Sequence, residues 1–171
     1  MRPPYAVVVG AVIVAFAAAG CGGAIPSSNG GPATLNVAGS TQGRFLVDAK
    51  GHSLYVFDKD ESGESYCNGA CAAVWPPLET PTPPHGGPGV DGAALGTIIR
   101  DDGEMQVTYH GHPLYYYAAD ASSPGKTRGK DIDQFGAGWY LVDSAGKSIE
   151  PESGSKSKPD SGWKNGGGGY R

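Results

Sequence analysis

Three histidines are the most obvious candidates for binding a metal or haem in this chain of 171 residues. His52 and His112 each follow a glycine in two similar segments, and His110 precedes His112 by two residues. Residues two apart on a strand share one face, so His110 and His112 have a spacing that suits a transition metal or haem iron. However, the sequence has no Cys-x-x-Cys-His haem-attachment motif, and histidines beside turns are often simply exposed. We therefore predict no cofactor, with a metal ion or haem as the alternative.

A group of carboxylates follows the first of these histidines and has part of a calcium-loop pattern. Starting from Asp58, oxygen-bearing side chains stand at the first, third and fifth positions, with a glycine at the sixth. The twelfth position is Gly69, where an EF-hand needs a bidentate glutamate, and helical flanks are missing. The pattern excludes an EF-hand and leaves, as an alternative, a weak cation site made by Asp58, Asp60, Glu61 and Glu64.

Motifs of the common enzyme classes are missing from the sequence. It contains no Gly-x-Ser-x-Gly nucleophile turn, no His-Glu-x-x-His zinc helix and no glycine-rich phosphate-binding loop. Nothing singles out a pair of carboxylates for glycoside hydrolysis. The formal net charge is -4, which argues against a broad electrostatic grip on nucleic acid. We predict a protein that is not an enzyme, with no catalytic residues, and that does not bind nucleic acid.

The first twenty residues have the pattern of an export signal. Arg2 precedes an apolar run from Ala6 to Ala19, which is long enough for a signal-peptide core and too short to span a membrane. The small residues before Cys21 resemble the lipobox of bacterial lipoproteins, although Ala18 stands where leucine is usual. This resemblance implies a signal peptide at 1–20 and acylation, for example with palmitate, of Cys21. The protein is then expected on the outer side of a bacterial membrane, held there by its lipid.

Export bears on the remaining cysteines, Cys67 and Cys71. Nearby thiols outside the cytoplasm normally oxidise, and a spacing of four allows a disulfide on a helical turn or in a compact loop. The alternatives are a redox pair or metal thiolates. Three residues separate these cysteines, whereas thioredoxin-like motifs have two. We predict a structural disulfide between Cys67 and Cys71.

Strands dominate the expected organisation of the chain. Alternating patterns and frequent turn residues predict one small all-β domain at about 34–149, with antiparallel strands and at most one short helix, at 68–74. A Gly/Pro/Ser-rich linker at 21–33 precedes it, and a tail at 150–171 is predicted to be disordered. Within the domain we expect a first repeat at about 43–78, an irregular, Pro-rich connector at about 79–94 and a second repeat at about 95–149.

The two repeats share a short signature. Residues 51–60 recur sixty positions later as 111–120. Each copy has a tyrosine, an aromatic residue two positions later and an aspartate three positions after that: Tyr55, Phe57 and Asp60, then Tyr115, Tyr117 and Asp120. On a strand the two aromatic side chains share a face and are expected in the core, while the aspartate is expected to accept backbone N–H groups in a turn. The alternative is a common groove or ion site lined by both copies. A tryptophan follows each copy, at Trp75 and Trp139.

This repeated signature resembles that of the bacterial secreted-repeat lipoproteins, a family of unknown function, over about residues 43–142. The resemblance implies a lipid-anchored envelope protein with tandem repeats and transfers no activity. We therefore predict a non-enzymatic binding or structural module of the cell envelope, whose partner is an envelope polymer or a protein. An extracytoplasmic metal or haem carrier, serving electron transfer, is the alternative.

Overall fold

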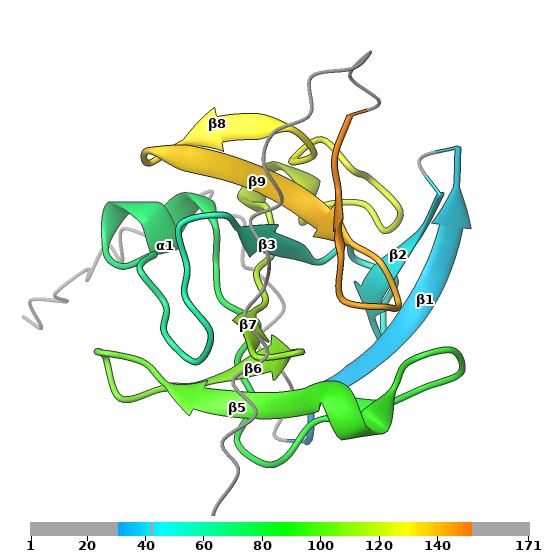
Figure 1. The fold of residues 1–171 in the computed structure, drawn as a ribbon, viewed down its shortest axis with the longest axis horizontal. Coiled ribbons are helices and arrows are strands. Elements are labelled where there is room, and N and C mark those ends of the chain that lie inside the picture. Colours follow the sequence, from blue (N-terminus) through cyan, green and yellow to red (C-terminus); the bar gives the residue numbers. More distant parts are fainter. Residues whose placement is uncertain (1–30, 42, 152–171) are drawn as a thin grey trace, which may run out of the picture.

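The computed structural model describes residues 31–41 and 43–151, whose strands form three small sheets (Figure 1). The first sheet has the order β2-β1-β4, with β1 at Thr34–Ser40, β2 at Gly43–Asp48 and β4 at His85–Gly86. The second has the order β10-β9-β3, with β8 also paired to β9; its strands are β3 (Tyr55–Phe57), β8 (Ile132–Gln134), β9 (Ala137–Val142) and β10 (Ser148–Ile149). The third has the order β5-β6-β7, with β5 at Leu95–Ile99, β6 at Met105–Tyr109 and β7 at His112–Pro113. In Figure 1, β3 lies near the centre of the three sheets.

Helical structure is confined to short pieces in the described part of the chain. The α-helix α1 covers Ala70–Val74, and the 3-10 helices η1 and η2 cover Gly92–Ala94 and Ala118–Asp120. The prediction of an all-β domain with one short helix is confirmed. The predicted signal peptide and Cys21 lie outside the described residues, as does most of the predicted linker and tail.

The connector between the repeats is more regular than predicted. Its strand β4 pairs in parallel with β1, because His85 N–H donates to the carbonyl of Ala33 at 2.8 Å and Gly87 N–H donates to that of Leu35 at 2.7 Å. Neither the alternation of apolar and polar residues nor β-strand propensity predicts a two-residue strand in a Pro-rich segment. The expectation of an irregular connector is therefore wrong at 85–86, since this part of the segment completes the first sheet.

The core consists of two clusters, and both repeats contribute to each. One cluster contains Ala33, Leu35, Leu46, Leu54, Val56, Leu78, Val107, Tyr109, Leu114, Tyr116 and Val142. The other contains Phe45, Val47, Tyr55, Phe57, Cys67, Cys71, Trp75, Tyr115, Trp139 and Leu141. Alternation along β3 sends Tyr55 and Phe57 into the second cluster and Val56 into the first. The repeats therefore form one intertwined domain.

Candidate functional site

The two copies of the signature are hydrogen-bonded to each other. The Tyr55 hydroxyl donates to Asp120 Oδ2 at 2.6 Å, and the Tyr115 hydroxyl donates to Asp60 Oδ2 at 2.6 Å. The backbones of the two tyrosines also pair, because each N–H donates to the other's carbonyl at 2.9 Å. Each repeat thus supplies the tyrosine for one pair and the aspartate for the other. We call these two contacts the crossed pairs.

A similar turn positions the aspartate of each pair. Asp60 N–H donates to the Phe57 carbonyl at 3.0 Å, and Asp120 N–H donates to the Tyr117 carbonyl at 2.9 Å. Each carboxylate also accepts a backbone N–H: Asp60 Oδ1 from Tyr66 at 2.8 Å, and both oxygens of Asp120 from Arg128 at 3.1 and 3.2 Å. Each carboxylate therefore accepts a backbone N–H group, as predicted, but the donor lies six or eight residues beyond the aspartate and not within its turn. Their bonds to the opposite tyrosines have no local sequence signal.

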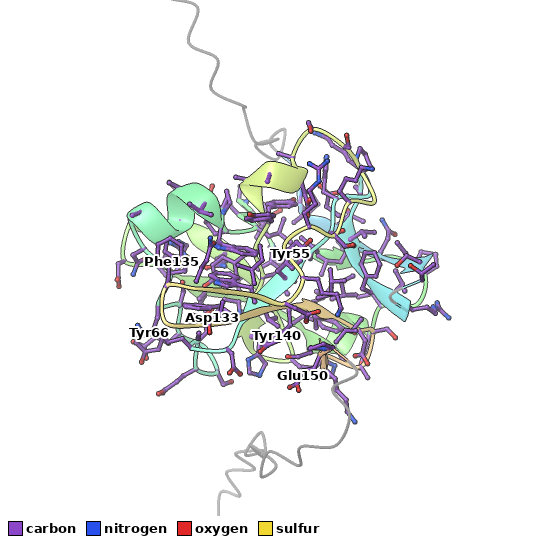
Figure 2. All side chains as sticks on the ribbon, turned by 90° about the horizontal axis from the view of Figure 1, so that it is seen from above. Tyr55, Tyr66, Asp133, Phe135, Tyr140 and Glu150 are labelled. Carbon is purple, nitrogen blue, oxygen red and sulfur yellow. A yellow bond between two sulfur atoms is a disulfide. The ribbon has the colours of Figure 1, made fainter. Side chains whose placement is uncertain are left out.

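Six aromatic rings join the crossed pairs into one stack. The indoles of Trp75 and Trp139 lie face to face, 3.9 Å apart and 5° from parallel. Phe57 stacks on Trp139 at 4.2 Å, and Tyr117 stacks on Trp75 at 4.4 Å. The edges of the crossed tyrosines complete this ring stack, as Tyr55 meets Trp75 at 5.5 Å and Tyr115 meets Trp139 at 5.2 Å. The labelled Tyr55 lies in the interior in Figure 2.

Burial governs the charges of the crossed pairs. Burial, together with Asp120, raises the pKa of Tyr55 far above its usual range, and burial with Asp60 does the same for Tyr115. Burial also raises the pKa of Asp60 to about 6, against the opposing influence of its hydrogen bonds from Tyr115 and Tyr66 and the charge of Arg100. Both phenols are therefore neutral at neutral pH, while Asp60 titrates near pH 6.

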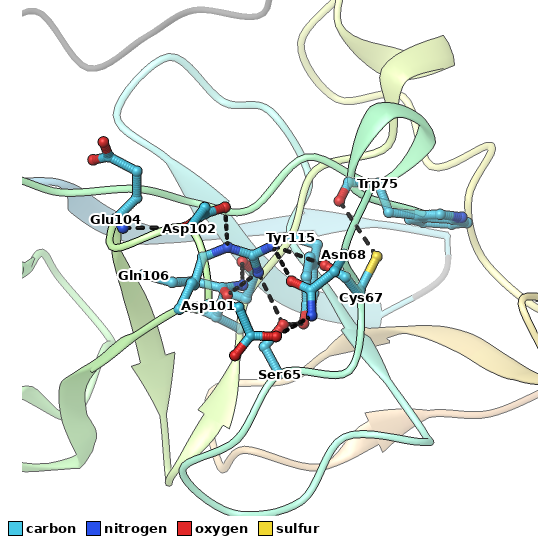
Figure 3. Close-up of polar contacts among 11 residues, drawn as sticks. Ser65, Cys67, Asn68, Trp75, Asp101, Asp102, Glu104, Gln106 and Tyr115 are labelled. Carbon is cyan, nitrogen blue, oxygen red and sulfur yellow. Dashed lines mark hydrogen bonds and ion pairs between the residues drawn. The ribbon is translucent and has the colours of Figure 1, made fainter. Parts of the chain in front are cut away.

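Arg100 is a central residue that sequence reasoning missed (Figure 3). It is 5 % exposed, and all five of its N–H donors have acceptors. These acceptors are Ser65 Oγ at 2.9 Å, Gln106 Oε1 at 2.8 Å, the Cys67 carbonyl at 2.8 Å, Asn68 Oδ1 at 3.0 Å and Asp102 Oδ2 at 3.3 Å. Ser65 in turn lies 2.7 Å from the Tyr115 hydroxyl. A hydrogen-bond chain therefore runs from Arg100 through Ser65 and Tyr115 to Asp60.

The predicted disulfide between Cys67 and Cys71 is confirmed. It closes the segment that leads into α1 and lies in the same core cluster as Trp75 and Trp139. The carbonyl of Cys67 is one of the acceptors for Arg100. The disulfide therefore stabilises a loop that binds the second repeat through a buried cation.

Comparison with known proteins identifies the repeats. The model of a family described as a secreted repeat of unknown function matches residues 36–79 and 96–143. The chain belongs to this family. No curated protein and no solved structure matches the chain. The family description implies a location outside the cell, and among the described residues no helix is long and apolar enough to cross a membrane.

The histidines of the secreted-repeat chain lie in different environments. His52 Nδ1 lies 3.0 Å from Asp48 Oδ2, which also accepts the Tyr116 hydroxyl at 3.2 Å, and this histidine is buried. His110 is in the two-residue turn between β6 and β7, with φ 49°, while His112 begins β7 opposite Tyr109. The expectation that His110 and His112 share a strand face is wrong, because the chain reverses between them. Burial, aided by His110, lowers the pKa of His112 to about 4.

The carboxylates that were considered for a cation site do not form one ligand set. Both oxygens of Asp60 are used by Tyr66 and Tyr115, while Asp58, Glu61 and Glu64 are exposed. Within residues 31–41 and 43–151, no group of three or more His, Cys, Asp or Glu side chains could hold a metal ion. The secreted-repeat signature is thus built into the core.

Two exposed aromatic residues were also missed by sequence reasoning. Phe135 is 42 % exposed at the tip of the β8–β9 hairpin, and Tyr66 is 40 % exposed in the loop before the disulfide. In Figure 2 both lie toward the same edge of the molecule. Phe135 has φ 59°, a left-handed conformation that bulky side chains rarely adopt. The residue types gave no signal, because exposure depends on tertiary packing.

Proposed function

We propose that this secreted-repeat protein is a non-enzymatic module of the bacterial cell envelope, attached by a lipid on Cys21, that binds a basic protein partner through the tip of the β8–β9 hairpin. Membership of the secreted-repeat family supports a location outside the cell, and the lipobox-like residues before Cys21 support the lipid anchor. The strained and exposed Phe135 is the observation that carries the binding proposal.

Burial of the signature supports a binding module over an enzyme. Tyr55 and Tyr115 are fully buried, Phe57 and Asp120 are 3 % exposed, and the polar atoms of the crossed pairs are engaged with each other. Such side chains stabilise the domain and offer little to a partner. The interaction surface therefore has to be formed by residues outside the signature.

The conformation of Phe135 is costly without a function. A two-residue hairpin turn with positive φ favours Asn, Asp or Gly, and Phe135 has φ 59° where Gly136 follows with φ 91°. Holding a bulky residue there costs about 1 to 3 kcal/mol. A side chain that stays 42 % exposed recovers only part of this cost through burial. The aromatic ring is thus kept at the tip for a contact outside the domain.

The charge of the neighbouring surface suggests the partner's chemistry. The phenol of Tyr140, on β9, has its pKa raised by burial and by the carboxylates of Asp58, Glu150, Asp131 and Asp133. Asp133 belongs to the same hairpin as Phe135, and in Figure 2 it lies between Phe135 and Tyr140. An aromatic ring beside several carboxylates favours lysine or arginine side chains, which form cation–π contacts and ion pairs.

Phe135→Asn tests this proposal, because it removes the ring while suiting the backbone. We expect the variant to be as stable as the wild type or more so, and to lose binding to envelope protein extracted from the producing bacterium. Ile99→Ser is the matched control, as Ile99 is 67 % exposed on β5, in another sheet. Wild-type binding should weaken as salt rises, because salt screens exposed charges. Unchanged binding by Phe135→Asn would refute the role of the hairpin.

The anchor has a separate test. Cys21→Ala should move the protein from the membrane fraction to the soluble fraction, because it removes the atom that carries the lipid. Arg44→Ala, an exposed change in the domain, is the control for handling losses. Unaltered partitioning of the Cys21→Ala chain into membranes would contradict lipidation.

A further inference from the structure

The ring stack has chemical features that packing alone does not require. Tyr55 and Tyr115 each contact a tryptophan edge-on, and each hydroxyl lies 2.6 Å from a carboxylate. Burying a carboxylate costs free energy that an apolar side chain of similar size would not. The combination of phenol, carboxylate and tryptophan occurs twice.

Such a phenol is suited to one-electron oxidation. When a phenol loses an electron its proton becomes strongly acidic, so oxidation is easiest when a base within hydrogen-bond reach takes the proton in the same step. Burial raises the pKa of Tyr55 far above its usual range, so this phenol keeps its proton in the resting protein. Asp120 Oδ2 is at the distance from which it can accept that proton.

The stack connects the buried phenols to a more accessible ring. Tyr117 is only partly buried and stacks on Trp75 at 4.4 Å. Trp75 contacts both Trp139, at 3.9 Å, and the edge of Tyr55, at 5.5 Å. An electron can therefore leave the core through rings in direct contact, and none of the steps crosses a gap.

The two phenols differ in their place along the stack. Tyr55 contacts Trp75, the indole that stacks on the partly buried Tyr117. Tyr115 contacts Trp139 instead, so a charge that enters through Tyr117 has to cross one more ring to reach it. Tyr55 is therefore the phenol closer to the accessible end of the stack.

We infer that the ring stack is a proton-coupled redox site, which accepts one oxidising equivalent and holds it as a neutral radical on Tyr55. The oxidant is a one-electron oxidant of high potential, such as a ferryl haem or a peroxide-derived radical. It takes one electron from Trp75 by way of the stacked Tyr117; Tyr55 returns one electron to Trp75 and passes its phenolic proton to Asp120. The products are the reduced oxidant, a neutral tyrosyl radical and a protonated carboxyl. A one-electron reductant such as a quinol reverses the step.

Flash photolysis of the purified full chain tests the inference, with photogenerated ruthenium(III) tris-bipyridine as the oxidant. We expect the absorption and electron paramagnetic resonance of a neutral tyrosyl radical in the wild type, in Tyr115→Phe and in Tyr66→Phe. We expect loss of that signal in Tyr55→Phe. Each phenylalanine keeps the ring, so the stack is retained, and thermal unfolding of each variant checks this.

A second measurement needs no substitution. In D₂O the wild-type radical should form more slowly, because the proton moves with the electron. A tyrosyl radical that persists in Tyr55→Phe would overturn the inference, and its disappearance in Tyr66→Phe would assign the oxidation to an exposed tyrosine. A tryptophan radical alone, or equal rates in H₂O and D₂O, would also overturn it. None of these outcomes depends on the hairpin that carries Phe135.

Discussion

The two crossed pairs have the same contact length and different support. In the pair of Tyr115 and Asp60, the phenol is reached by a side-chain chain from buried Arg100 through Ser65. In the pair of Tyr55 and Asp120, both partners are held by backbone N–H groups, of Gly129 and Arg128. One pair is thus embedded in a charged network, and the other is enclosed by a loop.

This difference shows that a repeated motif can be symmetric in packing without being symmetric in polarity. Ring contacts repeat closely, because Tyr55 meets Trp75 at 5.5 Å and Tyr115 meets Trp139 at 5.2 Å. The polar surroundings diverge, because residues outside the motif supply them. Removing rings should therefore affect both repeats alike, whereas removing polar atoms should separate them.

The largest effects are expected from removing whole rings. Tyr55→Ala and Tyr115→Ala should each lower the free energy of unfolding by about 3 to 5 kcal/mol, because each leaves a cavity in the ring stack. Tyr66→Ala, at an exposed tyrosine, should change it by no more than about 0.5 kcal/mol. Urea unfolding measures all three. A stable, monodisperse Tyr55→Ala protein would contradict a core role for the signature aromatics.

A somewhat smaller effect should distinguish the two sides of the comparison. Arg100→Ala removes a buried cation and leaves several acceptors unpaired, so we expect a loss of about 3 kcal/mol. Arg128→Ala is the matched control, because its backbone N–H still reaches Asp120 and its side chain makes an exposed contact to the Ala119 carbonyl at 3.0 Å. Its cost should stay within about 0.5 kcal/mol. Equal losses of unfolding free energy for Arg100→Ala and Arg128→Ala would contradict the difference in support between the two crossed pairs.

Replacing each aspartate by asparagine sharpens the comparison further. In Asp60→Asn the amide oxygen can still accept Tyr66 N–H, and the amide nitrogen can donate to Tyr115, whose hydroxyl turns to Ser65. We expect this change to be nearly silent at neutral pH. In Asp120→Asn the amide nitrogen faces another donor in either orientation. It faces the N–H of Arg128 in one orientation. In the other it faces the hydroxyl of Tyr55, which already accepts the N–H of Gly129.

The second substitution should therefore cost about 1 to 3 kcal/mol. The difference between Asp120→Asn and Asp60→Asn, measured by urea unfolding under the same conditions, is the decisive quantity. A larger loss for Asp60→Asn would show that the network around Arg100 depends on the charge of Asp60.

Local patterns predicted much of the fold. Period-two alternation assigns Tyr55 and Phe57 to one face, and β3 follows it because neighbouring side chains on a strand point to opposite sides. The export signal and the spacing together predicted the disulfide, since thiols outside the cytoplasm normally oxidise and residues four apart in a helical turn lie within bonding distance. The crossed pairs could not be predicted, because which tyrosine binds each aspartate depends on how the two repeats pack against each other.

The missed residues show the same limit. Arg100 binds Ser65, Cys67 and Asn68, which lie 32 to 35 residues away, so no local window contains the signal. For His110 the sequence did contain the necessary information, because a glycine at position 111 favours a turn. A turn at 110–111 is incompatible with a shared strand face for His110 and His112, and the positive φ angles of His110 and Gly111 show that the turn forms.

The smallest expected effect is the dependence of stability on pH through Asp60. Its pKa in the folded protein is raised from the model-compound value of 3.8 to about 6, so the folded state binds more protons than the unfolded state between these values. Unfolding free energy should therefore fall as pH rises from about 4 through about 6, and this contribution should become flat above about pH 7.

Other groups titrate in the same window, so the wild-type curve alone does not isolate Asp60. His112 has its folded pKa lowered to about 4, which contributes in the opposite sense, and Glu61 and Glu64 share the loop of Asp60. The neighbouring Tyr115 stays neutral across this pH range, because its pKa is raised far above it. Subtracting the curve of Asp60→Asn from that of the wild type leaves the contribution of Asp60, on the order of 1 to 2 kcal/mol. We expect this difference to favour the wild type near pH 4 and to vanish by neutral pH, whereas a difference that grows with pH would show that Asp60 is stabilised as a carboxylate.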